Sequence, residues 1–389
     1  MARELGDVSR PQIARRLGLS LPTVTNLVQQ LLEDGILTES GFSQSQGGRR
    51  ARLLRLNSAH IRAVGVECSL LGTEAVLVDL SGKVLARHSL AAPATRDPEA
   101  AMNAIYGLVD QVLAQTGQDK PNGIGVGVSG FVNRAEGISV QFPRAENWSN
   151  VPVASLLSRR YRLKTFVVND VQAATLGELR YGIGQGCRDF LYLHIGRGIR
   201  LGIVVGGELY YGSSGKAGEL GHMVVVEDGP ICYCGNYGCL ESLAGPPAIV
   251  NQALDAISKG VESTILNHVT GGVSGVDFGM VLSAATGGDR LATNLLAKAG
   301  QYIGRAVANL SNVLDPELVI VGGNPGQLGQ PLVEVINQTF RSVAMPPVRD
   351  RVQIRMSQFE SRPCSLGAGT LVFESFFQHG LRHLEPNQG

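Results

Sequence analysis

One histidine and three cysteines crowd a single short stretch of the chain, "GHMVVVEDGPICYCGNYGCLES". The stretch contains His222, Cys232, Cys234 and Cys239, so three of the six cysteines in 389 residues lie within eight positions. One imidazole and three thiolates make a complete tetrahedral ligand set, which suits Zn²⁺ in a structural site. The spacing is not the usual pair of Cys-x-x-Cys motifs, so scattered core thiols are the alternative. We predict a structural zinc site without an open coordination position for catalysis.

The composition indicates neither a membrane surface nor a strongly anionic partner. The net charge is +1, and 44% of the residues are hydrophobic. The longest apolar runs, such as "LVIVGG", fall far short of the roughly 20 residues of a membrane span. The start "MARELGDVSRPQ" has no apolar segment typical of a secretory signal. We therefore expect a cytoplasmic protein with no membrane partner, in which thiols stay reduced and a disulfide is a poor explanation of the cluster.

Residues 1–57 predict a winged helix-turn-helix DNA-binding domain. Ser9 and Gln12 match a capping box, Pro11 lies near the start of the first helix, Gly18 ends it and Ser20 caps the second. Apolar residues of the second helix recur at helical spacing and predict one buried stripe: Val24, Leu27, Val28, Leu31 and Leu32. The other face carries hydroxyls and amides that can bond base edges in the major groove: Thr23, Thr25, Asn26, Gln29 and Gln30.

A polar loop and a basic strand follow these helices in "TESGFSQSQGGRRARLLRLN". Arg49, Arg50 and Arg52 are placed as in a wing that contacts phosphates or the minor groove. The alternative is a solvated docking element with an incidental run of arginines. Because the turn, the helix face and the wing agree, we predict a double-stranded DNA operator as partner.

Residues 58–389 predict a duplicated α/β body. "IRAVGVECSLLGTEAVLVDLSGKVLARH" and "RDFLYLHIGRGIRLGIVVGGELYYG" share the plan strand, turn, strand, turn, strand, about 130 residues apart. The 50 glycines interrupt runs of β-branched residues, a pattern typical of sheets with tight turns next to a ligand. A duplicated unit predicts two similar lobes with a cleft between them, where a small ligand binds.

The chain resembles the ROK family of sugar kinases and sugar-responsive regulators. The cysteine stretch is similar to the family pattern G-H followed by C-x-C-G-x-x-G-C-x-E, and "VVNDVQAATLGE" and "LVIVGGNPG" add to the resemblance. The resemblance covers nearly the whole chain and is to the regulator branch typified by NagC, Mlc and XylR. It implies an actin-like, hexokinase-like body with lobe 1 at 58–168, completed by a C-terminal helix at about 362–382. Lobe 2, at 169–361, would then hold the zinc loop and the sugar site.

The resemblance also implies which residues bind the sugar: Asn169, Asp170, Glu219, His222 and Glu241. Carboxylates accept hydrogen bonds from sugar hydroxyls strongly because they are charged. Asp170 also suits the N-cap of the helix that follows it, and capping and sugar contact can coexist. Trp148, in "AENWSNVPV", belongs either to the wall of the site or to the core.

Two turns decide between a kinase and a sensor. Kinases of the family carry D-x-G-G-T where this chain reads "VECSLLGT", with Glu67 in place of the aspartate. Their G-T-G-I-G turn reads "GRGIR" here, so Arg197 and Arg200 bring side chains to the place of the ATP phosphates. We therefore predict a sugar-responsive regulator rather than an enzyme, a repressor of carbohydrate-utilisation genes whose effector is a sugar or sugar phosphate. A homodimer or homotetramer would present winged helices at half-site spacing. An ATP-dependent sugar kinase and a constitutive DNA-binding protein are the alternatives.

Overall fold

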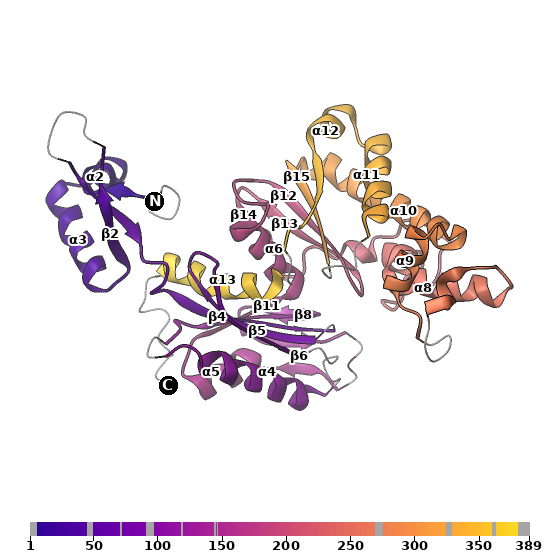
Figure 1. Cartoon of the computed structure of the whole chain (residues 1–389), viewed down its shortest axis with the longest axis horizontal. Coiled ribbons are helices and arrows are strands. Elements are labelled where there is room, and N and C mark those ends of the chain that lie inside the picture. Colours follow the sequence, from indigo (N-terminus) through magenta and orange to yellow (C-terminus); the bar gives the residue numbers. More distant parts are fainter. Residues whose placement is uncertain are drawn as a thin grey trace.

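The computed structural model contains a small N-terminal unit and a two-lobed body (Figure 1). It describes residues 6–44, 50–70, 72–90, 97–117, 120–143, 145, 147–268, 275–323, 329–359 and 363–379. Among these residues no helix is both long enough and apolar enough to cross a membrane.

The N-terminal unit is a winged helix-turn-helix. Its elements are β1 (Val8–Ser9), α2 (Arg10–Leu17), α3 (Leu21–Glu33), β2 (Leu37–Phe42) and β3 (Arg52–Leu56), with the strands in the order β1-β3-β2. Gln12 Oε1 accepts from the Ser9 backbone N at 2.8 Å, and Gly18 ends α2 in the left-handed conformation. Ser20 Oγ accepts from the Thr23 backbone N at 3.3 Å. Both predicted helices and their caps are therefore confirmed.

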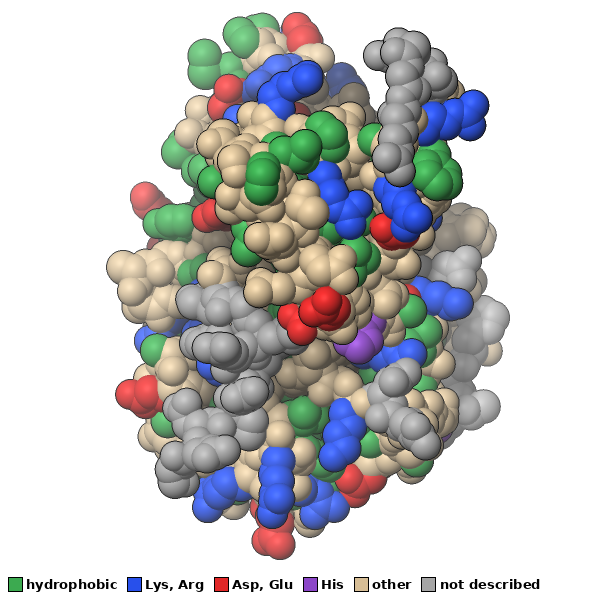
Figure 2. All heavy atoms as spheres, turned by 90° about the vertical axis from the view of Figure 1, so that its left-hand side faces the viewer, with side chains coloured by type: hydrophobic (Ala, Val, Ile, Leu, Met, Phe, Trp, Pro, Cys, Tyr) green, Lys and Arg blue, Asp and Glu red, His purple; other side chains and the backbone are tan. Residues whose placement is uncertain are grey.

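The buried stripe of α3 is narrower than predicted, so this prediction is wrong for Leu27 and Leu31. Val24 and Val28 are buried, but Leu27 and Leu31 are 47% and 36% exposed. The reason is that α2 and the small sheet pack against the Val24–Val28 side of α3 and leave the adjoining edge uncovered. Figure 2 views the molecule from the winged-helix side and shows hydrophobic side chains at the surface among basic ones.

The first lobe is built on a five-stranded sheet in the order β11-β7-β4-β5-β6. Its strands are β4 (Arg62–Ser69), β5 (Gly72–Asp79), β6 (Val84–Leu90), β7 (Ile124–Val128) and β11 (Thr165–Asn169). The hairpins β4–β5 and β5–β6 are antiparallel, whereas β4–β7 and β7–β11 are parallel. Helices α4 (Pro98–Leu113) and α5 (Val153–Tyr161) cover one face, and α13 (Pro363–His379) lies on the other (Figure 1). A small antiparallel sheet adjoins this lobe: β8 (Phe131–Asn133), β9 (Ile138–Gln141) and β10 (Ser149–Val151).

Two glycines allow α13 to lie directly on this sheet. A Cβ atom at Gly65 of β4 would lie 1.9 Å from the Ser365 carbonyl oxygen, and one at Gly125 of β7 would lie 1.8 Å from that of Ala368. These glycines therefore serve helix-on-sheet packing, and the expectation of turns next to a ligand does not describe them.

The second lobe repeats the plan of the first. Its sheet has the order β14-β13-β12-β15-β16, made of β12 (Phe190–Ile195), β13 (Ile199–Val205), β14 (Glu208–Leu209), β15 (Leu318–Gly323) and β16 (Gln353–Met356). As in the first lobe, three consecutive antiparallel strands are followed by parallel ones. The remaining helical elements are α6 (Asp170–Tyr181), η1 (Leu220–His222), α7 (Leu240–Ala244), α8 (Pro246–Ser258), η2 (Thr264–His268), α9 (Phe278–Thr286), α10 (Arg290–Leu314), α11 (Gln330–Val343) and α12 (Pro346–Arg351). The predicted duplication is confirmed.

Side chains of β12 alternate between two environments. Leu191, Leu193 and Ile195 belong to the large core formed with α7–α11. Tyr192 and His194 point to the opposite face, because successive side chains of a strand alternate. That face is turned toward α6 and the first lobe.

Candidate functional site

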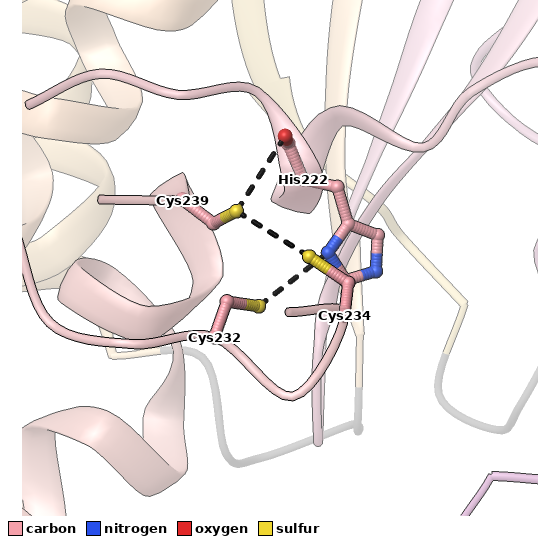
Figure 3. Close-up of side chains that lie close together, drawn as sticks. All are labelled: His222, Cys232, Cys234 and Cys239. Atoms are coloured by element: carbon pink, nitrogen blue, oxygen red, sulfur yellow. Dashed lines mark hydrogen bonds between the residues drawn. The ribbon is translucent and has the colours of Figure 1, made fainter. Parts of the chain in front are cut away.

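The four predicted metal ligands converge in one cluster. His222, Cys232, Cys234 and Cys239 each offer a ligand atom, and these atoms all lie within 4.8 Å of one another (Figure 3). The Cys234 and Cys239 sulfur atoms are 3.7 Å apart, and His222 Nδ1 is 3.6 Å from Cys232 Sγ. Zinc bonds of about 2.3 Å to sulfur and about 2.0 Å to nitrogen require tetrahedral edges of about 3.8 Å and about 3.5 Å. The observed separations fit a tetrahedral metal site, so the cluster could hold a metal ion.

Local structure brings the cluster together. His222 ends the short helix η1, and Cys239 caps the start of α7. Isolated β-bridges join Val224 to Cys239 and Ile231 to Tyr237, which folds the segment between them into a compact loop. The thiols therefore face one another rather than being scattered through the core.

A cavity of about 330 Å³ lies between the two lobes. Its first-lobe wall includes Glu67, Ser69 and Ser129, and its second-lobe wall includes the residues of β12 that face away from the large core. Asp170 at the start of α6 and Glu241 of α7 also line it. The volume is within the usual range for small-ligand sites, about 300–1,000 Å³.

Asp170 and Glu241 bring two carboxylates to this cavity. Ser129 Oγ donates a hydrogen bond to Asp170 Oδ2. The Ile199 backbone N donates to Glu241 Oε2 at 2.9 Å. Both side chains are thus held in place and present oxygen acceptors to a ligand.

The other three predicted sugar residues do not line the cavity. Asn169 is the N-cap of α6: its Oδ1 accepts from the Val171 backbone N at 2.9 Å, and its Nδ2 donates to the Gly130 carbonyl at 2.9 Å. The suggestion that Asp170 is the N-cap is therefore wrong, because Asp170 is the first residue inside the helix. Glu219 lies in a small adjoining hollow and pairs with Arg200 at 3.0 Å.

His222 is also separated from the cavity by a neighbouring side chain. Its Nδ1 faces Cys232, and its Nε2 lies 2.9 Å from the Tyr233 hydroxyl. Tyr233, rather than His222, lines the cavity.

Sequence reasoning missed three residues that line this cavity: Tyr192, His194 and Tyr233. The Tyr192 hydroxyl and His194 Nδ1 are buried without a hydrogen-bond partner among the described residues. Buried polar atoms ordinarily have partners, so these two are available to a ligand. The alternation of β12 was the available signal for them.

Electrostatics fix the charge states at the cavity floor. Burial lowers the pKa of His194, and the nearby Arg200 lowers it further, against an opposing effect of Asp170. Burial also lowers the pKa of Arg200, but Glu219, Asp170 and Glu241 outweigh it and raise that pKa overall. These effects favour the neutral imidazole of His194 and the charged guanidinium of Arg200.

Trp148 belongs to the core of the first lobe. It is buried, its Nε1 donates to Ser139 Oγ at 2.9 Å, and its ring lies 4.8 Å from that of Phe142. It does not line the cavity.

Comparison with known proteins decides the family. The profile described as "ROK family" matches residues 63–375, and that described as "Winged helix-turn-helix DNA-binding" matches residues 6–38. The chain belongs to the ROK family.

Two curated relatives match this ROK protein over almost its whole length. The "DNA-binding transcriptional dual regulator NagC" of Escherichia coli is 29% identical over 391 residues, covering 99% of this chain and 93% of the relative. The "Xylose repressor" of Caldicellulosiruptor bescii is 27% identical over 367 residues, covering 94% and 91%.

Two solved structures match its fold. One is a ROK family transcriptional regulator described as a homologue of the E. coli MLC protein, with a TM-score of 0.83, 24% identity and coverage of 97% of this chain and 95% of that one. The other is a ROK family glucokinase from Streptomyces griseus in complex with glucose and AMPPNP, with a TM-score of 0.71, 29% identity and coverage of 80% and 99%. The regulator match extends over the winged helix as well as the ROK body.

The winged helix of this ROK protein exposes all five predicted base-contacting residues of α3. Three of them have intramolecular partners: Thr23 bonds Ser20, Thr25 donates to the Leu21 carbonyl, and Gln29 bonds Glu33. The side chains of Asn26 and Gln30 make no hydrogen bond among the described residues, so they are available to bases.

The wing arginines differ in their surroundings. Arg49 lies outside the described residues. Arg50 is exposed, whereas Arg52 forms an ion pair with Glu39 and lies 6.0 Å from the centre of the Phe42 ring. If Arg52 contacts DNA, its ion pair with Glu39 must therefore be replaced by one with a phosphate group.

Proposed function

We propose that this ROK protein is a DNA-binding transcriptional repressor controlled by a sugar that binds between its lobes. The proposal rests on one observation: the same chain contains a winged helix and, after it, a two-lobed body with a carboxylate-lined cavity. Two relatives named as regulators match at least 94% of the chain.

The cavity chemistry supports a polyhydroxylated ligand. Asp170 and Glu241 offer acceptors to sugar hydroxyls, and charge-assisted hydrogen bonds of this kind are strong. Asn169, Glu219 and His222 act behind them by holding the α6 start, Arg200 and Tyr233. A ligand that contacts both lobes favours one arrangement of the lobes, and only such differential binding changes DNA affinity.

The test is binding of the protein to the DNA upstream of its own gene, measured by fluorescence anisotropy with and without pentoses, hexoses, N-acetylhexosamines and their phosphates. Asp170→Asn should leave DNA affinity intact and abolish the sugar response. Asp255→Asn, an exposed change on α8 outside the cavity, is the matched control and should behave like the parent protein. A sugar response that survives in Asp170→Asn would exclude the proposed site.

We further propose that the metal is zinc and that its role is structural. Three soft thiolates and one imidazole suit the borderline-soft Zn²⁺ ion, and four protein ligands fill its tetrahedral shell. The bound ion would tie His222 to Cys239 and thereby fix the loop that carries Tyr233.

A homodimer or homotetramer completes the proposal. Two winged helices bind two half-sites one helical turn of DNA apart, and a rotation of the lobes changes that spacing. We also propose the domain limits 1–57, 58–168 with the C-terminal helix at about 362–382, and 169–361. The packing of α13 on the first sheet supports the assignment of the C-terminal helix to lobe 1.

The proposed role is not enzymatic, although a sugar kinase remains the second candidate because of the similarity to a ROK glucokinase. Asp170 would be the base in such a kinase, since it reaches the cavity. Against phosphoryl transfer, Leu70 and Arg197 line the cavity where the kinases of the family have glycine-rich turns for ATP. ATP consumption that depends on an added sugar would favour the kinase.

A further inference from the structure

Tyr233 borders both the metal cluster and the cavity, which are otherwise separate. It lies between Cys232 and Cys234, and its hydroxyl is 2.9 Å from His222 Nε2. The two rings meet edge to face, with centroids 5.0 Å apart and planes at 79°. Figure 3 shows this second ring nitrogen of His222 on the side away from the sulfur atoms.

The other side of Tyr233 belongs to the cavity. Its side chain lines the cavity together with Arg200 and Glu241, and the residue is 67% exposed. A large aromatic side chain normally buries most of its surface. Tyr233 therefore presents an uncovered ring beside carboxylate and guanidinium groups.

We propose that Tyr233 is an effector-binding residue whose ring packs against the C–H face of a sugar in the cavity. This inference rests on the proposed function. A sugar ring offers apolar C–H groups on its face and hydroxyls at its edge. Tyr233 supplies an apolar wall for the face, and Asp170 and Glu241 supply acceptors for the edge.

The same geometry makes Tyr233 dependent on the metal cluster. Both of its chain neighbours are ligands, and its hydroxyl lies within hydrogen-bond distance of a third one. In other metal sites, a carboxylate or carbonyl group orients the metal-bound histidine through a hydrogen bond. Here the bond between the ligand His222 and the Tyr233 hydroxyl instead orients the phenol ring of Tyr233. The arrangement gives the cluster a role in effector binding in addition to stabilising its loop.

The test compares two tyrosines of the same loop. Tyr237 is 59% exposed, bridges Ile231 and does not line the cavity, so it is the matched control. Binding of D-xylose, D-glucose, N-acetyl-D-glucosamine and glucose 6-phosphate is measured by titration calorimetry on the parent protein and on Tyr233→Ala, Tyr233→Phe and Tyr237→Ala. Bound zinc is measured on the same samples.

We expect Tyr233→Ala to weaken effector binding about tenfold or more, because it removes the whole aromatic contact. Tyr233→Phe keeps the ring and loses the bond to His222, so binding should weaken only about two- to fivefold. Tyr237→Ala should bind like the parent protein, and zinc content should stay the same in all variants.

The outcomes separate this inference from the proposed function. If the parent protein binds a sugar and Tyr233→Ala binds it equally well, the inference is wrong and the proposed function stands. If the parent protein binds none of the pentoses, hexoses, N-acetylhexosamines and sugar phosphates of the anisotropy panel, both are wrong. If Tyr233→Ala loses zinc, the Tyr233→Phe variant is used to test the role of His222. Unchanged sugar affinity with full zinc content in Tyr233→Phe would show that His222 does not orient the tyrosine.

Discussion

At the scale of single residues, the metal cluster gives the sharpest prediction. Cys234→Ser replaces a thiolate by a hydroxyl, which is a poor zinc ligand, so we expect zinc affinity to fall by at least about tenfold and the Tm to fall with it. Cys187→Ser is the control, because that cysteine lies outside the cluster. Equal zinc stoichiometry in both variants, measured by mass spectrometry under native conditions, would exclude the ligand set.

From the residues alone, only groups close together in the sequence were predictable; Asp170 and Glu241, which the fold brings to one cavity, were predicted through the family resemblance. The cluster spans residues 222–239, and two local β-bridges bring the ends of this segment together. The alternation of β12 separates Tyr192 and His194 from Leu191 and Leu193. They were not predicted because the sequence does not show which face of this strand borders the cavity. Leu27 and Leu31 follow the helical period, but the period does not reveal how much of the stripe the rest of the domain covers.

At the scale of elements, the contact between α13 and the first sheet requires glycine, which has no side chain, at position 125 of β7. Gly125→Ala would place a Cβ atom 1.8 Å from the Ala368 carbonyl oxygen, which is backbone and cannot rotate away. We expect the free energy of unfolding to fall by about 1–3 kcal/mol or more. Gly107→Ala is the control: it lies in α4 with no atom near its Cβ position, so it should be stabilising by up to about 1 kcal/mol. Similar denaturation midpoints for the two variants would contradict this account.

The exposed face of α3 gives a second prediction for an element. Asn26→Ala and Gln30→Ala should each weaken binding to the operator by about 1–3 kcal/mol and leave binding to unrelated DNA unchanged, because these amides are free for base contacts. Thr25→Ala is the control, since its hydroxyl already donates to the Leu21 carbonyl at 2.8 Å. Equal losses on operator and unrelated DNA would mean that α3 contacts phosphates rather than bases.

At the scale of the whole molecule, α13 runs between the two functional regions. Pro363 and Cys364 at its start line the cavity. Phe373 and Phe376 near its end share a hydrophobic cluster with Ile36 of the winged helix. The same helix therefore lines the proposed effector site and shares a hydrophobic cluster with the base of the DNA-binding domain.

Ile36→Ala tests this link. It removes a buried side chain and should cost about 2–5 kcal/mol of stability. We expect sugar affinity without DNA to be unchanged, while the effect of saturating sugar on operator affinity shrinks. Leu19→Ala, at an exposed position of the winged helix, should retain the full effect. An undiminished sugar effect in Ile36→Ala would show that the signal does not pass through this contact.

The position of α13 also sets an order of events during synthesis of the chain. The winged helix is complete after its first 56 residues, whereas the first lobe receives its covering helix only with residues 363–379. The part of the first-lobe sheet that α13 covers, around Gly65 of β4 and Gly125 of β7, consequently stays uncovered until the second lobe has left the ribosome. Because domains emerge from the ribosome N-terminus first, we expect this part of the sheet to expose apolar side chains during that interval. A ribosome-bound chain stalled before residue 363 should therefore carry a folded winged helix on a protease-sensitive body.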